Sequence, residues 1–313
     1  MHIQRGAWAE INLDAVAHNV QMAKANLKPT TKLCAVVKAD AYGHGAVRVA
    51  QEAARNGADF FAVALLQEGV KLREAGIETP ILVLGSMLPE VAEICVRYDI
   101  SHAVFDEERL YALNAAALKL HTKAKIHIKI DTGMHRIGVH VRDAGRFAKL
   151  AASLPGIYIE GVFSHFATAD ADDKQYAAYQ FERFQEALRL IEAEGVHIPI
   201  RHIANSAALT ELQEYQLDMV RQGITLYGLH PAHMIDCYKD FEPVMTVKTQ
   251  VAFVKTLPPG ETIGYGRTYT LTRPSVIATV PIGYADGVSR RLSNRGYMLV
   301  NGMKAPIIGR VCM

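Results

Sequence analysis

One repeated pattern constrains the fold of this chain of 313 residues more than any other feature. Short apolar runs, rich in β-branched residues, alternate with amphipathic segments, which is typical of buried parallel strands separated by helices. The runs are residues 33–37, 60–64, 81–85, 102–105, 126–130, 157–163, 198–203 and 224–229, and clear helical segments are 46–57, 107–120 and 176–195. Eight such units predict an α/β fold with an N-terminal (β/α)8 TIM-like barrel. A doubly wound sheet is the alternative, but no GxGxxG motif follows the first run.

The two ends of the chain depart from this pattern. Short predicted strands with frequent Pro and Gly, at 247–256, 276–282, 298–302 and 305–311, indicate a mostly-β domain of at least about 70 residues. We therefore expect a barrel over 14–235, which starts with a helix capped by Asp14, and a β-domain over 236–313. A strand within 1–13 is expected to pack with the β-domain. Because the chain ends at Met313 within a predicted strand, the β-domain is expected to be incomplete.

Composition and charge exclude several classes of function. Half of the residues are hydrophobic, which permits a large core, and the formal net charge of +2 gives no reason to expect binding to nucleic acid or a membrane. The four cysteines, Cys34, Cys95, Cys237 and Cys312, form no CxxC pair and resemble reduced thiols of a cytosolic protein. No signal peptide and no apolar stretch of the roughly 18 residues that a membrane span needs is found. We expect a cytoplasmic protein.

A lysine ends the first apolar run. In LCAVVKADAYGHG, residues 33–45, a predicted buried strand leads directly into Lys38 and then into turn-forming residues. Burial of an ammonium group without a partner is costly, so a lysine held there would have a lowered pKa and a nucleophilic amine suited to a Schiff base. Taken alone, Lys38 is more readily explained as a side chain that extends into solvent.

Polar residues also follow the other predicted strands. In a (β/α)8 barrel the active groups lie at the C-terminal ends of the strands. The candidates there are Lys129, Arg136, His165, Asn205, Ser206, Arg221, Gly223 and Ile224. Each has a simpler interpretation on its own, such as a buried histidine, a surface ion pair or a helix cap. Their shared position at strand ends favours an active site.

Eight motifs occur in order along essentially the whole chain. They are AVVKADAYGHG (35–45), KIDTGMHRIG (129–138), EGVFSHFATAD (160–170), HIANSAA (202–208), RQGITLYG (221–228), GYGRTYT (264–270), PIGYADG (281–287) and GRVCM (309–313). Together they resemble the motifs of the alanine racemases, pyridoxal-phosphate enzymes with an N-terminal barrel and a C-terminal β-domain. The chain departs from the family at its end, since the family continues beyond GRVCM with an aspartate and further strands.

The resemblance implies two catalytic bases. Lys38 would form a Schiff base with pyridoxal phosphate, an electron sink that acidifies the substrate Cα–H. Lys38 would act on D-alanine, and Tyr265 would act on L-alanine from the opposite face. A free tyrosine has a pKa of about 10, and His165 and Arg221 would form the hydrogen-bonded group that lowers it. Arg221 beside the pyridine nitrogen would keep that nitrogen unprotonated, which favours a racemase over a decarboxylase.

The resemblance also implies a phosphate site at the last barrel strand. The hydroxyls of Tyr42 and Ser206 and the backbone N–H groups of Gly223 and Ile224 would donate to the phosphate, as in other barrels of this type. Asn205 would contact the cofactor beside them, as would His165, Arg221 and Arg136.

The resemblance implies further roles for Arg136, Lys129, Tyr284 and Met313. Arg136 would orient the substrate carboxylate and the cofactor phenolate oxygen. Lys129 would carry a carbamate whose carboxylate holds Arg136, which would explain a lysine beside an arginine inside a barrel. Tyr284 and Met313 would line the route of the substrate and contact it. No metal is expected.

The sequence thus predicts pyridoxal-phosphate-dependent interconversion of L-alanine and D-alanine, which supplies D-alanine for cell-wall peptidoglycan. A homodimer with shared active sites is expected. A racemase of broader range (serine, lysine or arginine) is left open, because sequence does not report the volume of a pocket. A decarboxylase of the same fold is disfavoured by Arg221, and a non-enzymatic pyridoxal-phosphate-binding protein by the β-domain that bears Tyr265.

Overall fold

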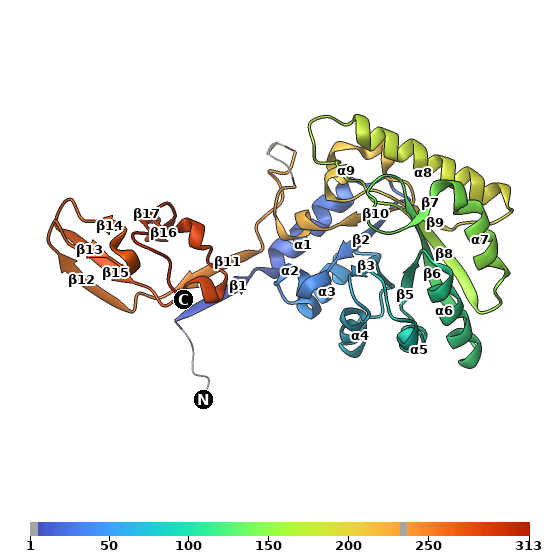
Figure 1. Ribbon diagram of the computed structural model, residues 1–313, viewed down its shortest axis with the longest axis horizontal. Helices are drawn as coiled ribbons and strands as arrows, with labels where there is room; N and C mark the ends of the chain where they lie inside the picture. The colour runs from blue at the N-terminus through green and yellow to red at the C-terminus, as the bar shows by residue number, and fades with distance from the viewer. Residues whose placement is uncertain (1–5, 232–236) are drawn as a thin grey trace. The chain divides into compact units, whose positions relative to one another are not determined.

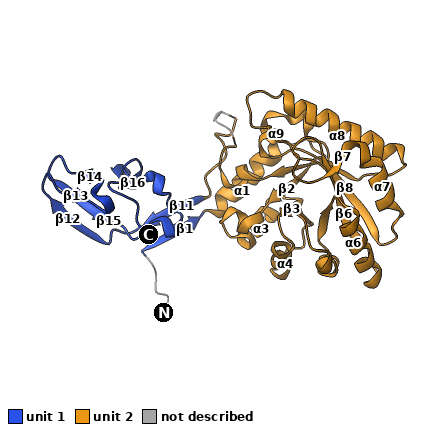
Figure 2. Cartoon of the chain, viewed as in Figure 1, with its two compact units in different colours: residues 1–11, 245–313 blue, residues 12–244 orange. Residues whose placement is uncertain are grey.

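The computed structural model describes residues 6–231 and 237–313 and separates the chain into two compact units (Figure 2). The barrel unit comprises residues 12–244, and the β unit comprises residues 1–11 and 245–313. The expected bounds were 14–235 for the barrel and 236–313 with part of 1–13 for the β-domain, so they differ from these by a few residues. The expected boundary at 235/236 and residues 1–5 lie outside the described residues. The barrel unit extends beyond its last strand because residues 237–244 return to the first helix, where the Glu242 N–H donates to Asn19 Oδ1 at 2.7 Å.

Eight parallel strands form a nearly closed barrel, which confirms the predicted fold (Figure 1). They are β2 (Lys32–Val36), β3 (Phe60–Val63), β4 (Ile81–Val83), β5 (Ser101–Val104), β6 (Ala124–Asp131), β8 (Ile157–Phe163), β9 (Ile200–His202) and β10 (Met219–Gln222). Strand β10 pairs with β2, and a short strand β7 (Val139–His140) pairs with β6. Between β9 and β10 the Asp218 N–H donates to the Arg201 carbonyl at 3.0 Å.

Helices surround these strands in Figure 1. They are α1 (Leu13–Ala25), α2 (Lys38–Tyr42), α3 (Ala46–Arg55), α4 (Leu66–Glu74), α5 (Ala92–Arg97), α6 (Glu107–Lys119), α7 (Ala144–Ser153), α8 (Gln175–Ala193) and α9 (Ser206–Glu211). The predicted cap of α1 is wrong by two positions, because the Asn12 side chain accepts from the N–H groups of Asp14 and Ala15. In the described part of the chain, every helix is too short or too polar to cross a membrane.

The eighth strand lies earlier in the chain than predicted. The apolar run 224–229 was expected to form it, but Ile224–Tyr227 is a short 3₁₀ helix, η4, and the strand is β10. Strand β10 could not be recognised from hydropathy because two of its four residues, Arg221 and Gln222, are polar although they are buried. The run is apolar because most of η4 is buried against α1, where the Asn19 side chain donates to the Leu226 carbonyl at 3.1 Å.

The interior of the barrel changes from apolar to polar along the strands. Its apolar cluster consists of Cys34, Val36, Phe60, Ala62, Leu82, Ile200 and Met219. Because alternate strand residues share a face, the residues two positions after Ile200 and Met219 also point inward. These are His202 and Arg221, both buried. The polar end is therefore built on the strands that carry the apolar cluster.

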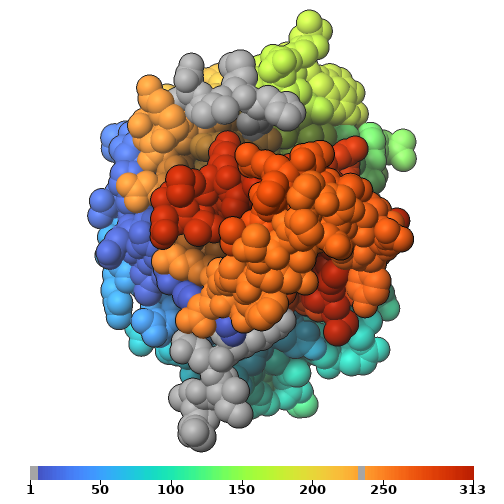
Figure 3. Space-filling model, turned by 90° about the vertical axis from the view of Figure 1, so that its left-hand side faces the viewer, coloured from blue at the N-terminus to red at the C-terminus, as the bar shows by residue number. Residues whose placement is uncertain are grey.

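The β unit consists of two-stranded antiparallel pairs. They are β1 (Ala7–Ile11) with β11 (Met245–Thr249), β12 (Phe253–Leu257) with β15 (Ser275–Thr279), β13 (Thr262–Ile263) with β14 (Tyr269–Thr270), and β16 (Tyr297–Val300) with β17 (Met303–Pro306). The expected strand over 305–311 is therefore wrong beyond Pro306. There the backbone instead bonds to neighbouring loops, with the Gly309 N–H donating to Asn294 Oδ1 at 2.6 Å. Residues 245–313 of this unit are orange to red in Figure 3. The exposed apolar side chains of the unit include Phe253 and Leu299.

Candidate active site

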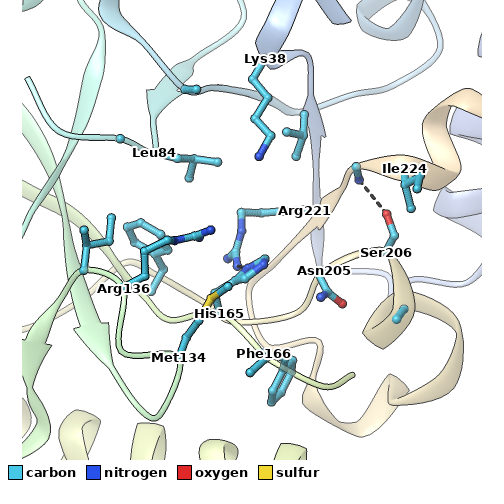
Figure 4. Close-up of a pocket in the computed structure, with 18 of the residues that line it drawn as sticks. Lys38, Leu84, Met134, Arg136, His165, Phe166, Asn205, Ser206, Arg221 and Ile224 are labelled. Atoms are coloured by element: carbon cyan, nitrogen blue, oxygen red, sulfur yellow. Dashed lines mark hydrogen bonds between the residues drawn. The ribbon is translucent and has the colours of Figure 1, made fainter. Parts of the chain in front are cut away.

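A cavity of about 590 Å³ lies in the barrel unit, lined by residues at or just after the C-terminal ends of the strands. It brings together ten of the residues predicted from the sequence: Lys38, Tyr42, Lys129, Arg136, His165, Asn205, Ser206, Arg221, Gly223 and Ile224. Figure 4 shows the Lys38 amine and the guanidinium groups of Arg136 and Arg221 directed into the same space. Apolar side chains of Leu84, Met134 and Phe166 complete the wall.

Lys38 stands at the start of an unusual turn. The next four residues, Ala39 to Tyr42, all have positive φ angles between 51° and 56°, and Gly43 follows at 85°. The left-handed conformation costs roughly 1–2 kcal/mol per non-glycine residue, so it persists only where the surroundings enforce it. Here the Glu68 carboxylate accepts from the N–H groups of Ala39 (2.5 Å) and Ala64 (2.7 Å). The turn brings Tyr42 to the cavity that Lys38 lines.

The environment of Lys38 favours its neutral amine. Burial lowers the pKa of Lys38, and the positive charges of Arg136 and Arg221 lower it further, while Glu68 opposes this shift. Its Nζ lies 5.9 Å from the centre of the Tyr42 ring. A half-buried lysine with a lowered pKa has the properties of a nucleophile.

Arg221 is almost fully buried and has no acidic partner among the described residues. Its Nη1 donates to His202 Nδ1 at 2.7 Å, and its Nη2 lies 3.0 Å from His165 Nδ1. Further donation goes to the backbone carbonyls of Ser164 (2.8 Å) and Ile203 (3.0 Å). Burial lowers the pKa of Arg221 to about 10, which still leaves the guanidinium charged at neutral pH.

His165 connects Arg221 to the cavity. Because a guanidinium can only donate, the 3.0 Å contact requires an unprotonated Nδ1 on His165, which places the ring proton on Nε2. Burial and then the charge of Arg221 hold the pKa of His165 well below its usual value. His165 is therefore a neutral imidazole with one N–H available.

Lys129 lies deep in the same site. Only 3% of it is exposed, and its Nζ donates to the Ile130 carbonyl at 2.7 Å. In the described residues no carboxylate lies within ion-pair distance of this amine. Burial, followed by the charge of Arg221, lowers the pKa of Lys129 to about 7. The surroundings of Lys129 therefore favour its neutral, nucleophilic amine.

The last barrel strand ends in a cradle suited to an anion. Ser206 Oγ accepts from the Gly223 N–H at 2.8 Å, as the dashed line in Figure 4 marks. A Cβ added to Gly223 would lie 3.4 Å from the Tyr42 hydroxyl and 3.7 Å from Ser206 Oγ, so these groups converge on a space that glycine leaves open. Asn205, beside them, caps α9 by accepting from the Ala208 N–H at 3.1 Å. Hydroxyl and backbone N–H donors around an open space fit a phosphate group.

Tyr265, Tyr284 and Met313 lie in the β unit and do not line this cavity. The N–H groups of Tyr284 and Ala285 donate to the carbonyls of Cys312 (2.9 Å) and Met313 (3.2 Å). A Cβ added to Gly266, next to Tyr265, would lie 3.4 Å from the Arg310 guanidinium. The end of the chain therefore lies beside the loops that carry both tyrosines. The side chain of Tyr265 is 75% exposed in the single chain.

Two residues that shape the site were not predicted from the sequence. Glu68 holds the turn after Lys38, and His202 contacts Arg221 inside the barrel. His202 stands in the motif HIANSAA, so its position was visible in the sequence. Glu68 lies in an amphipathic helix, where an acidic residue gives no signal of its own.

Comparisons with known proteins agree with this geometry. The alanine racemase N-terminal domain matches residues 11–231, and the alanine racemase C-terminal domain matches residues 244–313. The chain is 46% identical to an alanine racemase of Desulfovibrio desulfuricans over 309 residues, which covers 99% of this chain and 83% of that protein. It is 48% identical over 311 residues to an alanine racemase of Halothermothrix orenii, with coverage of 99% and 82%.

A solved structure of an alanine racemase from Clostridium difficile 630 superimposes with a TM-score of 0.94 at 39% identity, over 99% of this chain and 82% of that one. One from Bacillus anthracis, with bound L-Ala-P, gives a TM-score of 0.92 at 39% identity and covers 100% and 81%. Matches to both domains, together with relatives this similar over nearly the whole chain, show that the chain belongs to the alanine racemase family.

Proposed function

We propose that this amino-acid racemase interconverts L-alanine and D-alanine, with pyridoxal phosphate bound in the barrel cavity. The observation that supports this most directly is the cavity itself, in which a lysine of lowered pKa faces an anion cradle and a buried arginine. A cavity of about 590 Å³ accommodates a cofactor and a small amino acid.

The residues around the cavity fit the cofactor. Lys38 would hold it through its amine, and Arg221 would face its ring nitrogen. The hydroxyls of Tyr42 and Ser206 and the N–H groups of Gly223 and Ile224 would bind its phosphate, with the Gly223 N–H exchanging its bond to Ser206 Oγ for one to the phosphate. When bound, pyridoxal phosphate supplies an electron sink that acidifies the Cα–H of the amino acid. An arginine at the ring nitrogen does not readily give up its proton, which weakens that sink and disfavours decarboxylation.

Racemisation requires a proton to leave Cα on one face and to arrive on the other. On one face of Cα, the Lys38 amine would exchange a proton with D-alanine. Tyr265 would do the same for L-alanine on the opposite face, supplied by a second subunit in a homodimer. His165, neutral and hydrogen-bonded to Arg221, would support the tyrosine oxygen as it changes charge. Tyr284 and Met313, beside the same chain end as Tyr265, would contact the substrate.

The product of the proposed reaction, D-alanine, suggests a role in cell-wall synthesis. D-alanine is a building block of peptidoglycan, and we propose that the enzyme supplies it for the cell wall. A cytoplasmic location stays a prediction of the sequence.

The test is direct. The full chain, loaded with pyridoxal phosphate, should abolish the circular dichroism of L-alanine as it converts half of it to D-alanine, because the two enantiomers are equally stable. Removal of the cofactor with hydroxylamine should stop the reaction, and its return should restore it. Parallel incubations with L-serine, L-lysine and L-arginine distinguish a racemase of broader range. An unchanged signal from L-alanine, with cofactor bound, would contradict the proposal.

We predict that Lys129 is carbamylated and that the carbamate binds Arg136. A pKa of about 7 leaves enough neutral amine to attack CO₂, which forms an N–C bond and releases one proton. The new carboxylate would give the buried cations the acidic partner that the described residues lack. Lys129→Ala should lose roughly 10-fold to 100-fold in kcat, the usual range for an outer-shell partner, and recover part of it with added acetate. Lys123→Ala, at an exposed position, is the control and should behave as wild type. An intact-mass spectrum without the added CO₂ and no response to acetate would contradict the prediction.

A further inference from the structure

A continuous chain of hydrogen bonds runs through the interior of the barrel, away from the cavity. Arg221 Nη1 contacts His202 Nδ1 at 2.7 Å, and His202 Nε2 contacts His127 Nδ1 at 2.8 Å. His127 Nε2 in turn contacts Glu160 Oε2 at 3.0 Å, and the Ser101 hydroxyl donates to that same oxygen at 2.5 Å. The chain links an arginine of the cavity to a carboxylate that does not line it.

The bonding pattern sets the direction of every proton in the chain. Arginine can only donate, so His202 must accept at Nδ1 and carry its proton on Nε2. His127 then accepts at Nδ1 and carries its proton on Nε2, from which it donates to the carboxylate of Glu160. Both rings are neutral in this arrangement, and burial together with the charge of Arg221 keeps the pKa of His202 well below its usual value. All donors point from the cation to the anion.

The positive charge of Arg221 explains why such a chain of hydrogen bonds would be needed. Arg221 is 3% exposed and lies within a cluster of positive charge. The charges of Lys38 and Arg136 lower the pKa of its buried neighbour His165, and Arg136 also lowers the pKa of Lys129. A buried cation without an acidic partner is costly. Among the described residues, Glu160 is the carboxylate that hydrogen bonds connect to Arg221. Burial raises the pKa of Glu160, but the hydrogen bonds from His127 and Ser101 outweigh it and hold that pKa below its usual value, so the carboxylate is ionised.

The backbone is shaped to fit the chain of side chains. A register shift between Ile126 and His127 sets His127 opposite Gly161 in the β6–β8 pairing. A Cβ at position 161 would lie only 2.5 Å from His127 Nδ1, so glycine makes room for the ring. The His202 ring stacks on Phe163 at 4.9 Å with an interplanar angle of 9°. These contacts fix both rings in the orientation that the hydrogen bonds need.

We propose that His202, His127 and Glu160 form a relay of positioning residues that holds Arg221 in place and tunes how strongly it donates into the cavity. The two histidines are fully buried, and Glu160 is partly buried at the far end. The proposal rests on the proposed function only for the contact between Arg221 and the cofactor ring. Outer partners of this kind orient the groups that touch the reacting molecule, and networks in a low-dielectric interior transmit a change in charge from one bond to the next. With Glu160 neutral, the guanidinium would be a more acidic donor toward the ring nitrogen.

The relay can be tested in the full chain without cofactor, by NMR of ¹⁵N-labelled histidines. The wild type should show His127 and His202 as neutral rings protonated at Nε2. Glu160→Gln should shift the Nε2–H resonance of His202, which the Glu160 carboxylate does not touch. Glu186→Gln, an exposed carboxylate on α8, should leave it unchanged. A proton on Nδ1 of either ring, or a His202 resonance that ignores Glu160→Gln, would overturn the proposal.

A second measurement uses ¹⁵N-labelled pyridoxal phosphate in the loaded enzyme. Glu160→Gln should move the ring-nitrogen resonance and lower kcat by roughly 10-fold, with KM changed less than about threefold. A purely structural role would lower thermal stability but leave the resonance and the kcat of the folded enzyme as in wild type, and that outcome would reject the relay. A wild type that binds no cofactor would contradict the proposed function instead, and the histidine resonances would still decide the relay.

Discussion

Replacing Lys38 with alanine should abolish racemisation, with a loss of at least about 10⁴-fold in kcat. One positioned acid or base contributes roughly 10²-fold to 10⁴-fold, and Lys38 would also hold the cofactor. Its amine faces the cavity, with a pKa that burial and the neighbouring arginines lower. Chiral chromatography of alanine after prolonged incubation at saturating pyridoxal phosphate measures the residual rate.

Two controls make this result specific. Lys123→Ala, which removes an exposed lysine, should retain wild-type activity. Borohydride treatment of the wild type should attach the cofactor irreversibly to the peptide that contains Lys38, and the same treatment of Lys38→Ala should label no peptide. Attachment to any other lysine, or more than about a tenth of the activity left in Lys38→Ala, would show that another residue carries the cofactor.

Mixing two inactive variants should restore about a quarter of the wild-type activity. Lys38 lies in the barrel unit and Tyr265 in the β unit. The resemblance to the alanine racemases implies a homodimer in which each active site combines the barrel of one subunit with the β unit of the other. Lys38→Ala and Tyr265→Ala should each be nearly inactive alone. After dissociation and random reassociation, half of the dimers contain one subunit of each kind, and two-fold symmetry leaves one intact site in each of these dimers.

The exchange of subunits must be observed separately, by native mass spectrometry of an isotope-labelled variant. A mixture of Lys38→Ala with wild type measures the activity that simple dilution leaves. If mixed dimers form and no activity returns, Tyr265 acts on the barrel of its own chain, and the shared site is wrong. The Lys38 prediction is independent of that outcome.

The architecture and the location of the cavity could be predicted from the sequence because both depend on local periodicity. Parallel strands bring their C-terminal ends to one edge, so residues that follow different strands meet without any knowledge of their contacts. Lys38, His165 and Ser206 were found in this way and line one cavity. The same logic failed at the eighth strand, because Arg221 and Gln222 are buried by pairing and packing that hydropathy does not record.

Contacts between distant residues could not be predicted. His127 and His202 are 75 positions apart, and His127 and Glu160 are 33 apart, so no local pattern marks them as one chain of hydrogen bonds. A histidine or glutamate within a predicted strand looks like a departure from the apolar pattern. The left-handed turn after Lys38 could not be predicted for a related reason. Alanine and tyrosine seldom adopt positive φ, and the contact from Glu68 that supports the turn lies 29 positions away in the sequence.

The sequence by itself determined the alternation of strands and helices in the barrel, the family, and ten of the residues that line the cavity. The buried residues of a helix or strand recur with the period of that element, so the period can be read from the order of apolar and polar residues in the sequence. The tertiary structure alone decided the protonation and partners of those residues: the neutral His165, the lowered pKa of Lys129, and the link from Arg221 to Glu160. Desolvation and hydrogen bonding depend on what surrounds a group in space, and neighbours in space need not be neighbours in sequence.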